Sequence, residues 1–194
     1  MRPFPAACLA IALAVGVSAA SPACAGPNLL VNGNFATGDL TGWTVSGNPT
    51  VPLVKSSFAG FVPLSGNYFL AVGPVGSDGI LSQTFSDVPG GRLTVTGYLA
   101  SSGAGPSDFS ASIDGVPGYS LNPIPVQGYQ EFSFTAPATG SDTLTLAYRN
   151  DPAWSAIDDL SVTEVLPVPE PAGVAIIGTG LICLGVIRAR RARA

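Results

Sequence analysis

The chain of 194 residues carries 8 basic and 12 acidic residues and no histidine, and its charged fraction of 10% is well below the roughly 25% of ordinary soluble domains. The absence of histidine excludes Ser-His-Asp triads and most zinc sites, and it removes the commonest general base. Eleven acids but only three bases fall between Gly26 and Pro169, so this segment has a net charge of −8, which disfavours binding to nucleic acid.

The amino terminus has the pattern of an export signal. The basic residue Arg2 precedes an apolar stretch over residues 6–17, which is expected to be helical, and an A-x-A sequence formed by Ala23 and Ala25 stands before Gly26. The first 25 residues are therefore predicted to be a signal peptide that is removed by cleavage before Gly26.

The three cysteines all lie outside the segment that would be exported. Cys8 and Cys24 belong to the predicted signal peptide, and Cys183 lies in an apolar stretch near the carboxyl terminus. The exported part therefore has no disulfide and no thiolate nucleophile, and one hydrophobic core must hold it together. Residues 21–24 also resemble, though poorly, the lipobox that precedes a lipid-modified cysteine. A lipoprotein modified at Cys24 is therefore the alternative to ordinary cleavage before Gly26.

The middle of the chain has the alternation of β-strands. Apolar and polar residues alternate over Arg92–Leu99, Glu131–Thr135 and Thr143–Tyr148, the two-residue period of a strand with one buried face. Turn sequences rich in Gly, Pro, Asn and Asp separate such stretches. We therefore expect an all-β fold, an antiparallel two-sheet jelly-roll sandwich over residues 26–165. The expected strands are Leu29–Val31, Trp43–Ser46, Val51–Val54, Tyr68–Val72, Ile80–Phe85, Arg92–Leu99, Phe109–Ile113, Glu131–Thr135, Thr143–Tyr148 and Ile157–Val165.

The two ends of this segment resemble a known family. The opening, Asn-Leu-Leu-Val-Asn-Gly-Asn-Phe over residues 28–35, and the closing Ile-Asp-Asp-Leu-Ser-Val over residues 157–162 are similar to those of galactose-binding-like jelly rolls, a fold shared with carbohydrate-binding modules. The resemblance implies a structural calcium ion, held in the family by an acid after the opening motif and an aspartate of the closing strand. Here Ala36 stands in place of that acid. The implied calcium ligands are Asp39, backbone carbonyls near Asn34, and either Asp158 or Asp159. The alternative is that these acids cap backbone amides or face water.

Aromatic rings that stack on sugars are the other candidates for ligand contact. Trp154 lies in a polar loop immediately before the last expected strand, and Tyr119 and Tyr129 flank a proline-rich stretch. These three side chains are expected to line a rim, whereas Trp43, in an apolar strand, is expected to pack in the core.

The carboxyl terminus has three parts in fixed order. Residues 166–171 contain three prolines and read as a stiff linker, residues 172–187 are apolar without a charge, and four arginines lie within residues 188–194. As a helix the apolar stretch would span roughly 24 Å, which suits a single transmembrane helix. Because unpaired guanidinium groups stay out of the bilayer core, the basic tail is expected to be cytoplasmic and the sandwich outside.

This tail resembles the PEP-CTERM sorting signal, also known as the C-terminal domain of ice-binding proteins. The resemblance implies an exosortase as partner, processing near the Pro-Glu-Pro step, transient membrane anchoring and a final place in the cell envelope or outside the cell of a bacterium that makes exopolysaccharide. An ordinary single-pass anchor is the alternative, and ice binding does not follow from a sorting address. The matching residues are Pro169, Glu170, Pro171, Arg188, Arg190, Arg191 and Arg193.

The sequence as a whole favours a non-catalytic exported protein that binds polysaccharide or envelope partners through its sandwich. A glycan-active enzyme is the first alternative, and it would need two carboxylates about 5–10 Å apart in one cleft. Asp158 and Asp159 are adjacent on an expected strand, so they should point to opposite faces and not pair with each other. A purely structural matrix component without a defined ligand is the second alternative.

Overall fold

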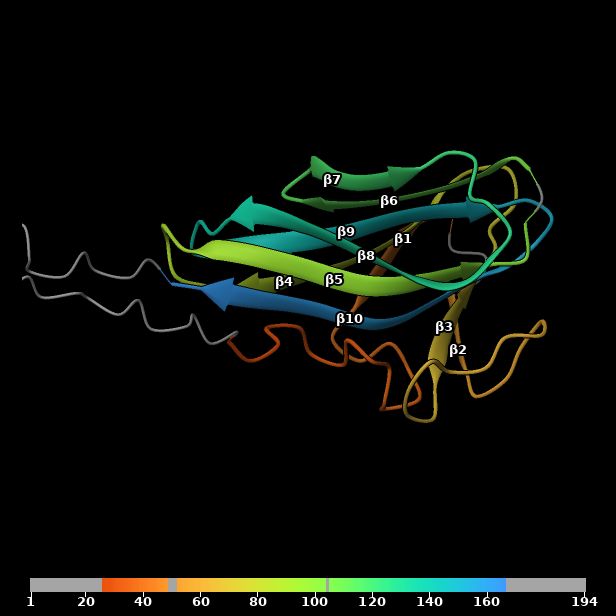
Figure 1. Ribbon diagram of the computed structural model, residues 1–194, viewed down its shortest axis with the longest axis horizontal. Helices are drawn as coiled ribbons and strands as arrows, with labels where there is room; N and C mark the ends of the chain where they lie inside the picture. The colour runs from red at the N-terminus through yellow and green to blue at the C-terminus, as the bar shows by residue number, and fades with distance from the viewer. Residues whose placement is uncertain (1–25, 49–51, 104, 167–194) are drawn as a thin grey trace, which may run out of the picture. The chain divides into compact units, whose positions relative to one another are not determined.

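The computed structural model describes residues 26–48, 52–103 and 105–166, which belong to one compact unit (Figure 1). The predicted signal peptide, the linker beyond Leu166, the predicted transmembrane helix and the arginine tail lie outside the described residues. Within the described ranges, no helix has the length and apolar character needed to cross a membrane.

Two antiparallel sheets of five strands each stack face to face, so the expectation of an all-β antiparallel sandwich is confirmed (Figure 1). Sheet A has the order β1 (Thr44–Gly47), β4 (Gly79–Ser86), β9 (Ser141–Asn150), β6 (Ser107–Ile113) and β7 (Val116–Leu121). Sheet B has the order β2 (Pro52–Lys55), β3 (Phe69–Val72), β10 (Ser155–Val165), β5 (Arg92–Ser101) and β8 (Gln127–Pro137).

The core lies between the sheets and follows from the alternation of side chains along each strand. In β9, Leu144, Leu146 and Tyr148 are buried, and the residues between them are partly exposed. Leu93 and Val95 of β5 face them from sheet B. Burial of apolar surface, worth about 25 cal/mol per Å², therefore holds the two sheets together, because the described residues contain no cysteine.

The edge strand β7 was not expected from the sequence. Pro117 and Gly118 interrupt any apolar alternation over this stretch, and proline removes a ladder donor. Both are tolerated because β7 pairs only with β6 and is the edge of sheet A.

The expected strand Leu29–Val31 is wrong, although the segment does lie beside β10. The N–H of Leu29 donates to the carbonyl of Val162 (2.8 Å). The chain then bends, because Asn32 and Phe35 both adopt a φ of 54°. A backbone that enters the left-handed region twice within four residues cannot continue a ladder.

Asn28 joins this amino-terminal segment to β10 with its side-chain amide. Its Oδ1 accepts from the N–H of Leu30 (3.1 Å) and of Val162 (2.9 Å), and its Nδ2 donates to the carbonyl of Leu160 (3.0 Å). One side chain thus supplies the partners that a neighbouring strand would otherwise give to β10.

Replacing Asn28 by alanine should lower the free energy of unfolding by about 1–3 kcal/mol, because the N–H of the buried Val162 loses its acceptor. Urea denaturation of the purified variant measures this loss. Asn67 is exposed, so Asn67→Ala is the matched control, and equal losses in the two variants would contradict the role given to Asn28.

Candidate functional site

The outer face of sheet A is a floor of small side chains. Antiparallel register aligns Thr44, Ser82, Thr145 and Ser112 in one row across β1, β4, β9 and β6. All of these side chains are partly or fully exposed, because their strand neighbours point into the core. We call this surface the sheet A floor; its next row consists of Ser46, Ile80, Ala147, Ser110 and Ser120.

A polar hollow of about 380 Å³ lies at one end of the sheet A floor. Asp78 comes from the turn before β4, Asp108 from β6, and Asn122 directly follows β7. We call it the Asp78–Asp108 hollow. Its lining is completed by Phe109, Ser110, Ser120 and Leu121.

The carboxylates of Asp78 and Asp108 accept no hydrogen bond from any residue that the structure describes. Burial raises the pKa of Asp108, the negative charge of Asp78 raises it further, and the charge of Arg149 opposes the rise. Glu131, exposed on the outer face of sheet B, likewise accepts no hydrogen bond from the described part of the chain. The remaining described carboxylates all accept hydrogen bonds within the protein: Asp39, Asp87, Asp114, Asp142, Asp151, Asp158, Asp159 and Glu164.

Arg149 lies next to this hollow, because its Cα is the register partner of Asp108. Its guanidinium is held by Asp151, with Nη2 at 3.5 Å from Oδ2, and its Nε is buried without a hydrogen-bond partner in the described part of the chain. The end of the floor therefore presents two free acceptors and a partly engaged cation, a set that can hold a hydroxyl-rich ligand. Sequence reasoning missed these residues, since they are far apart in the chain and belong to no motif.

The predicted contact residues Trp154 and Tyr129 lie on the other side of the protein, on the outer face of sheet B. Trp154 meets Phe58 edge to face, with ring centroids 4.6 Å apart and an interplanar angle of 82°. The hydroxyl of Tyr129 donates to the carbonyl of Val62 (3.1 Å). Together with Phe61 these rings cover a second small apolar cluster, so they anchor the loop of residues 56–67 on the sheet.

Tyr119 lies elsewhere, and the structure does not bring it together with Tyr129. Its ring stacks on Phe132 at 5.3 Å and meets Phe109 at 6.2 Å, both within the main core. Tyr119 on β7 points into the main core, whereas Tyr129 on β8 points to the outer face of sheet B. Their positions on either side of the proline-rich stretch in the sequence do not indicate these directions.

The four predicted calcium ligands do not all line one hollow. Asn34 and Asp159 line one hollow of about 320 Å³ that Asp39 and Asp158 do not line. Asp39 accepts from the Thr37 hydroxyl (2.6 Å) and the N–H of Thr41 (3.0 Å), as a capping acid would. Within the described ranges no group of three or more acidic, histidine or cysteine side chains could hold a metal ion. Calcium binding stays a prediction.

Asp158 and Asp159 do not point to opposite faces, because the register of β10 shifts between Asp158 and Ser161. Asp159 adopts a φ of 49° there, and its carboxylate accepts from the Ser65 hydroxyl (2.7 Å). Asp158 is fully buried and accepts from the N–H groups of Leu64 (2.9 Å) and Ser65 (3.4 Å). Both carboxylates therefore hold the end of the loop of residues 56–67.

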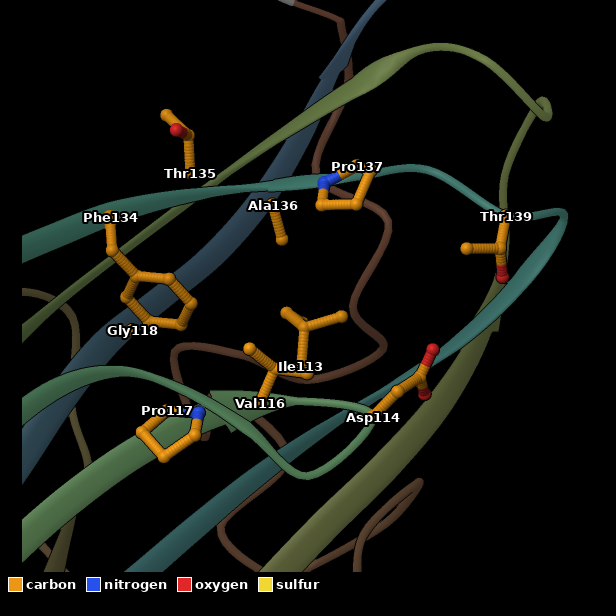
Figure 2. A pocket seen from close by; sticks show the side chains of 10 residues that line it. All are labelled: Ile113, Asp114, Val116, Pro117, Gly118, Phe134, Thr135, Ala136, Pro137 and Thr139. Carbon is orange, nitrogen blue, oxygen red and sulfur yellow. The ribbon is translucent and has the colours of Figure 1, made fainter.

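An apolar groove of about 250 Å³ lies between β7 and β8, at the edges of the two sheets (Figure 2). Ile113, Val116, Phe134 and Ala136 converge on it, and only Asp114 and two threonines add polar atoms. Such a lining offers few partners to a hydroxylated ligand.

The fold is similar to those of several solved domains, among them carbohydrate-binding modules and an adhesin domain. A CBM61 module in complex with β-1,4-galactotriose has a TM-score of 0.59 at 18% identity, over 71% of this chain and 98% of that one. The CBM22-1 xylan-binding domain of Xyn10C from Paenibacillus barcinonensis has a TM-score of 0.52 at 18% identity, over 74% and 98%. The K3 cleaved adhesin domain of Lys-gingipain from Porphyromonas gingivalis has a TM-score of 0.52 at 13% identity, over 72% and 99%. No family model and no curated protein matches the chain.

Replacing Trp154 by alanine should lower the free energy of unfolding by about 2 kcal/mol, because a half-buried ring loses its contact with Phe58. The loop of residues 56–67 should also be cleaved faster by proteases. Chemical denaturation and limited proteolysis measure the two effects. Trp154→Phe keeps most of the contact and is the control; an unchanged stability in Trp154→Ala would show that the ring is free.

The buried carboxyl of Asp158 should make stability depend on pH. Burial raises its pKa from 3.8 to about 6, so the folded state binds this proton more tightly than the unfolded state. The resulting stabilisation is complete below pH 3.8 and is lost as the pH rises through about 6, an effect on the order of 3 kcal/mol. Unfolding of wild type and Asp158→Asn between about pH 4 and about pH 7 measures it. Parallel curves for the two proteins would contradict this assignment.

Proposed function

We propose that this protein is a non-catalytic, exported carbohydrate-binding protein that holds polysaccharide on the sheet A floor. A jelly-roll body similar in fold to carbohydrate-binding modules supports this proposal. The single observation that carries it is the Asp78–Asp108 hollow, where two carboxylates without internal hydrogen bonds lie among hydroxyl and amide side chains.

The chemistry of this surface suits a sugar chain. Serine and threonine hydroxyls can donate and accept, the two carboxylates accept, and the amide of Asn122 does both. Small side chains leave the floor open to a flat ligand, and the partly exposed Arg149 places a positive charge beside the hollow. The outer face of sheet B is less suitable, because its aromatic rings pack on one another and on the loop that they anchor.

Replacing Asp108 by asparagine should weaken binding of the recognised polysaccharide about tenfold, because one charge-assisted acceptor becomes neutral. The recognised glycan is found by screening the mature protein on a glycan array, and affinities are then measured by isothermal titration. Glu131→Gln removes a similarly free carboxylate from the other sheet and is the control. Equal affinities for wild type and Asp108→Asn would show that the glycan binds elsewhere on the protein. If the array shows no glycan ligand at all, a purely structural matrix component would be favoured.

A second candidate function is favoured by the same pair of acids. Two carboxylates in one hollow are what a glycan-active enzyme requires, one as acid and the other as base or nucleophile, and burial raises the pKa of Asp108 as an acid would need. Release of reducing ends from the bound glycan, lost in both Asp78→Asn and Asp108→Asn, would support this candidate over a binding module.

Export and sorting complete the proposal. The signal peptide would carry the chain across the inner membrane, and the Pro-Glu-Pro tail would anchor it there until an exosortase processes it. The protein would then belong to the cell envelope or the extracellular matrix. These assignments rest on the sequence pattern of segments outside the described residues.

The mature protein recovered from its host should begin at Gly26 and lack the arginines after residue 187. Intact mass spectrometry reads both ends and any added group in one measurement. A product that retains residues 188–194 would point instead to an ordinary single-pass anchor, and one that retains residues 1–25 would argue against export.

A further inference from the structure

We infer that two copies of this protein pair along β8, so that sheet B of one copy continues into sheet B of the other. This inference does not depend on the proposed carbohydrate binding, because the sheet A floor takes no part in the contact. Three features of the described part of the chain carry it: an unprotected strand edge, an apolar groove beside that edge, and two opposite charges that flank it without an ionic partner.

The edge formed by β8 is the least protected of the four sheet edges in the described part of the chain. β1 and β2 have only four residues each, and Pro117 interrupts β7. β8 has eleven residues, its only charge is Glu131, and its only proline is its last residue, Pro137. On the side away from β5, its N–H and C=O groups pair with no strand that the structure describes. Such a row of free backbone groups is a template for another strand.

The apolar groove between β7 and β8 opens on the same side of the sandwich (Figure 2). Val116 is 70% exposed, and Phe134 and Ala136 are only partly buried although they pack against the core. The ring of Phe134 lies over Gly118, where any side chain would collide with it, so β7 cannot close the groove by itself. A second sandwich joined to β8 would remove part of this lining from water, which favours association.

Two unpaired charges of opposite sign lie along this edge. Arg92 and Glu131 are exposed on the outer face of sheet B and form no ion pair with any residue that the structure describes. The guanidinium of Arg92 extends from β5 to the edge strand, where its Nη1 donates to the hydroxyl of Thr135 (2.9 Å). The edge therefore has a positive group beside Thr135 and a negative group four residues earlier in the same strand.

A two-fold axis at Ser133 makes these charges complementary. An antiparallel pair of β8 strands centred there sets Glu131 of each copy directly opposite Thr135 of the other, with Cβ atoms about 5 Å apart. Each carboxylate then lies beside the guanidinium that Thr135 binds, and the symmetry forms this ion pair twice. A pair centred on Glu131 itself would set two carboxylates opposite each other, so the charges select the register centred on Ser133.

Such a dimer is closed and leaves the sheet A floor accessible. The contact is isologous, so the two β8 edges satisfy each other and none remains free for a third copy. Because the axis is perpendicular to the sheets, both sheet A floors face the same side and neither is covered.

The test is cysteine cross-linking of the full-length protein, in a Cys183→Ser background. The described part of the chain contains no cysteine, so Ser133→Cys adds a single thiol there. Residues directly opposite each other in an antiparallel pair are close enough for a disulfide, so mild oxidation should give a product of twice the mass of one chain. Ser86 is also exposed but lies on β4 of sheet A, so Ser86→Cys is the matched control and should stay monomeric.

Charge reversal tests the register. Added to the Ser133→Cys protein, Arg92→Glu or Glu131→Arg alone should lower the cross-linked fraction about tenfold, because each change replaces two attractions by two repulsions. The two reversals together should restore cross-linking, because the ion pairs form again with their signs exchanged. This restoration also shows that neither change prevents folding, which circular dichroism of each single variant checks directly.

Each outcome bears on the dimer without bearing on carbohydrate binding. Cross-linking of Ser133→Cys no stronger than that of Ser86→Cys would overturn the inference. Dimers that persist after a single reversal, or that the double reversal does not restore, would also overturn it, because the copies would then meet in another register. A cross-linked product of a different mass would show that another protein occupies this edge.

Discussion

Two sheets packed face to face, with no helix covering either of them in the described part of the chain, impose one constraint on everything else. Each strand must send every second side chain into the core, so each sheet has one face left to cover or to use. In sheet B, part of that face is covered by the loop of residues 56–67, which Trp154, Tyr129 and the carboxylate of Asp158 hold in place. Among the residues that the structure describes, no such loop covers the sheet A floor, and its serine and threonine side chains are partly or fully exposed.

Much of the fold could be predicted because the two-residue period is a local property. The strands expected around Leu93, Phe132 and Leu144 all exist, and their apolar residues face the core as alternation requires. The failures have local causes of a different kind. β7 contains proline and glycine that an edge strand tolerates, and the segment after Asn28 keeps its hydrogen bonds to β10 while its backbone turns away.

The candidate site was beyond prediction, because it depends on register rather than on pattern. Asp78 ends a turn and Asp108 lies on a strand that is not adjacent to β4, so only the order of strands in sheet A brings them to one hollow. The packing of Trp154 could not be predicted for the same reason, because its partner Phe58 lies in a loop far away in the sequence. Asp158 and Asp159 show a further limit, since a shift of register turns two adjacent carboxylates toward one serine.

The carboxylates of this protein divide into two groups with different physical consequences. Those of Asp158 and Asp142 are buried and receive several donors, so they contribute to the position of loops and turns. Those of Asp78 and Asp108 stay at a solvent-filled surface, where water satisfies them at little cost to stability. Because the fold does not need them, these two carboxylates are free to take part in the binding that we propose for the sheet A floor. A ligand that replaces that water must bring hydrogen-bond donors of its own.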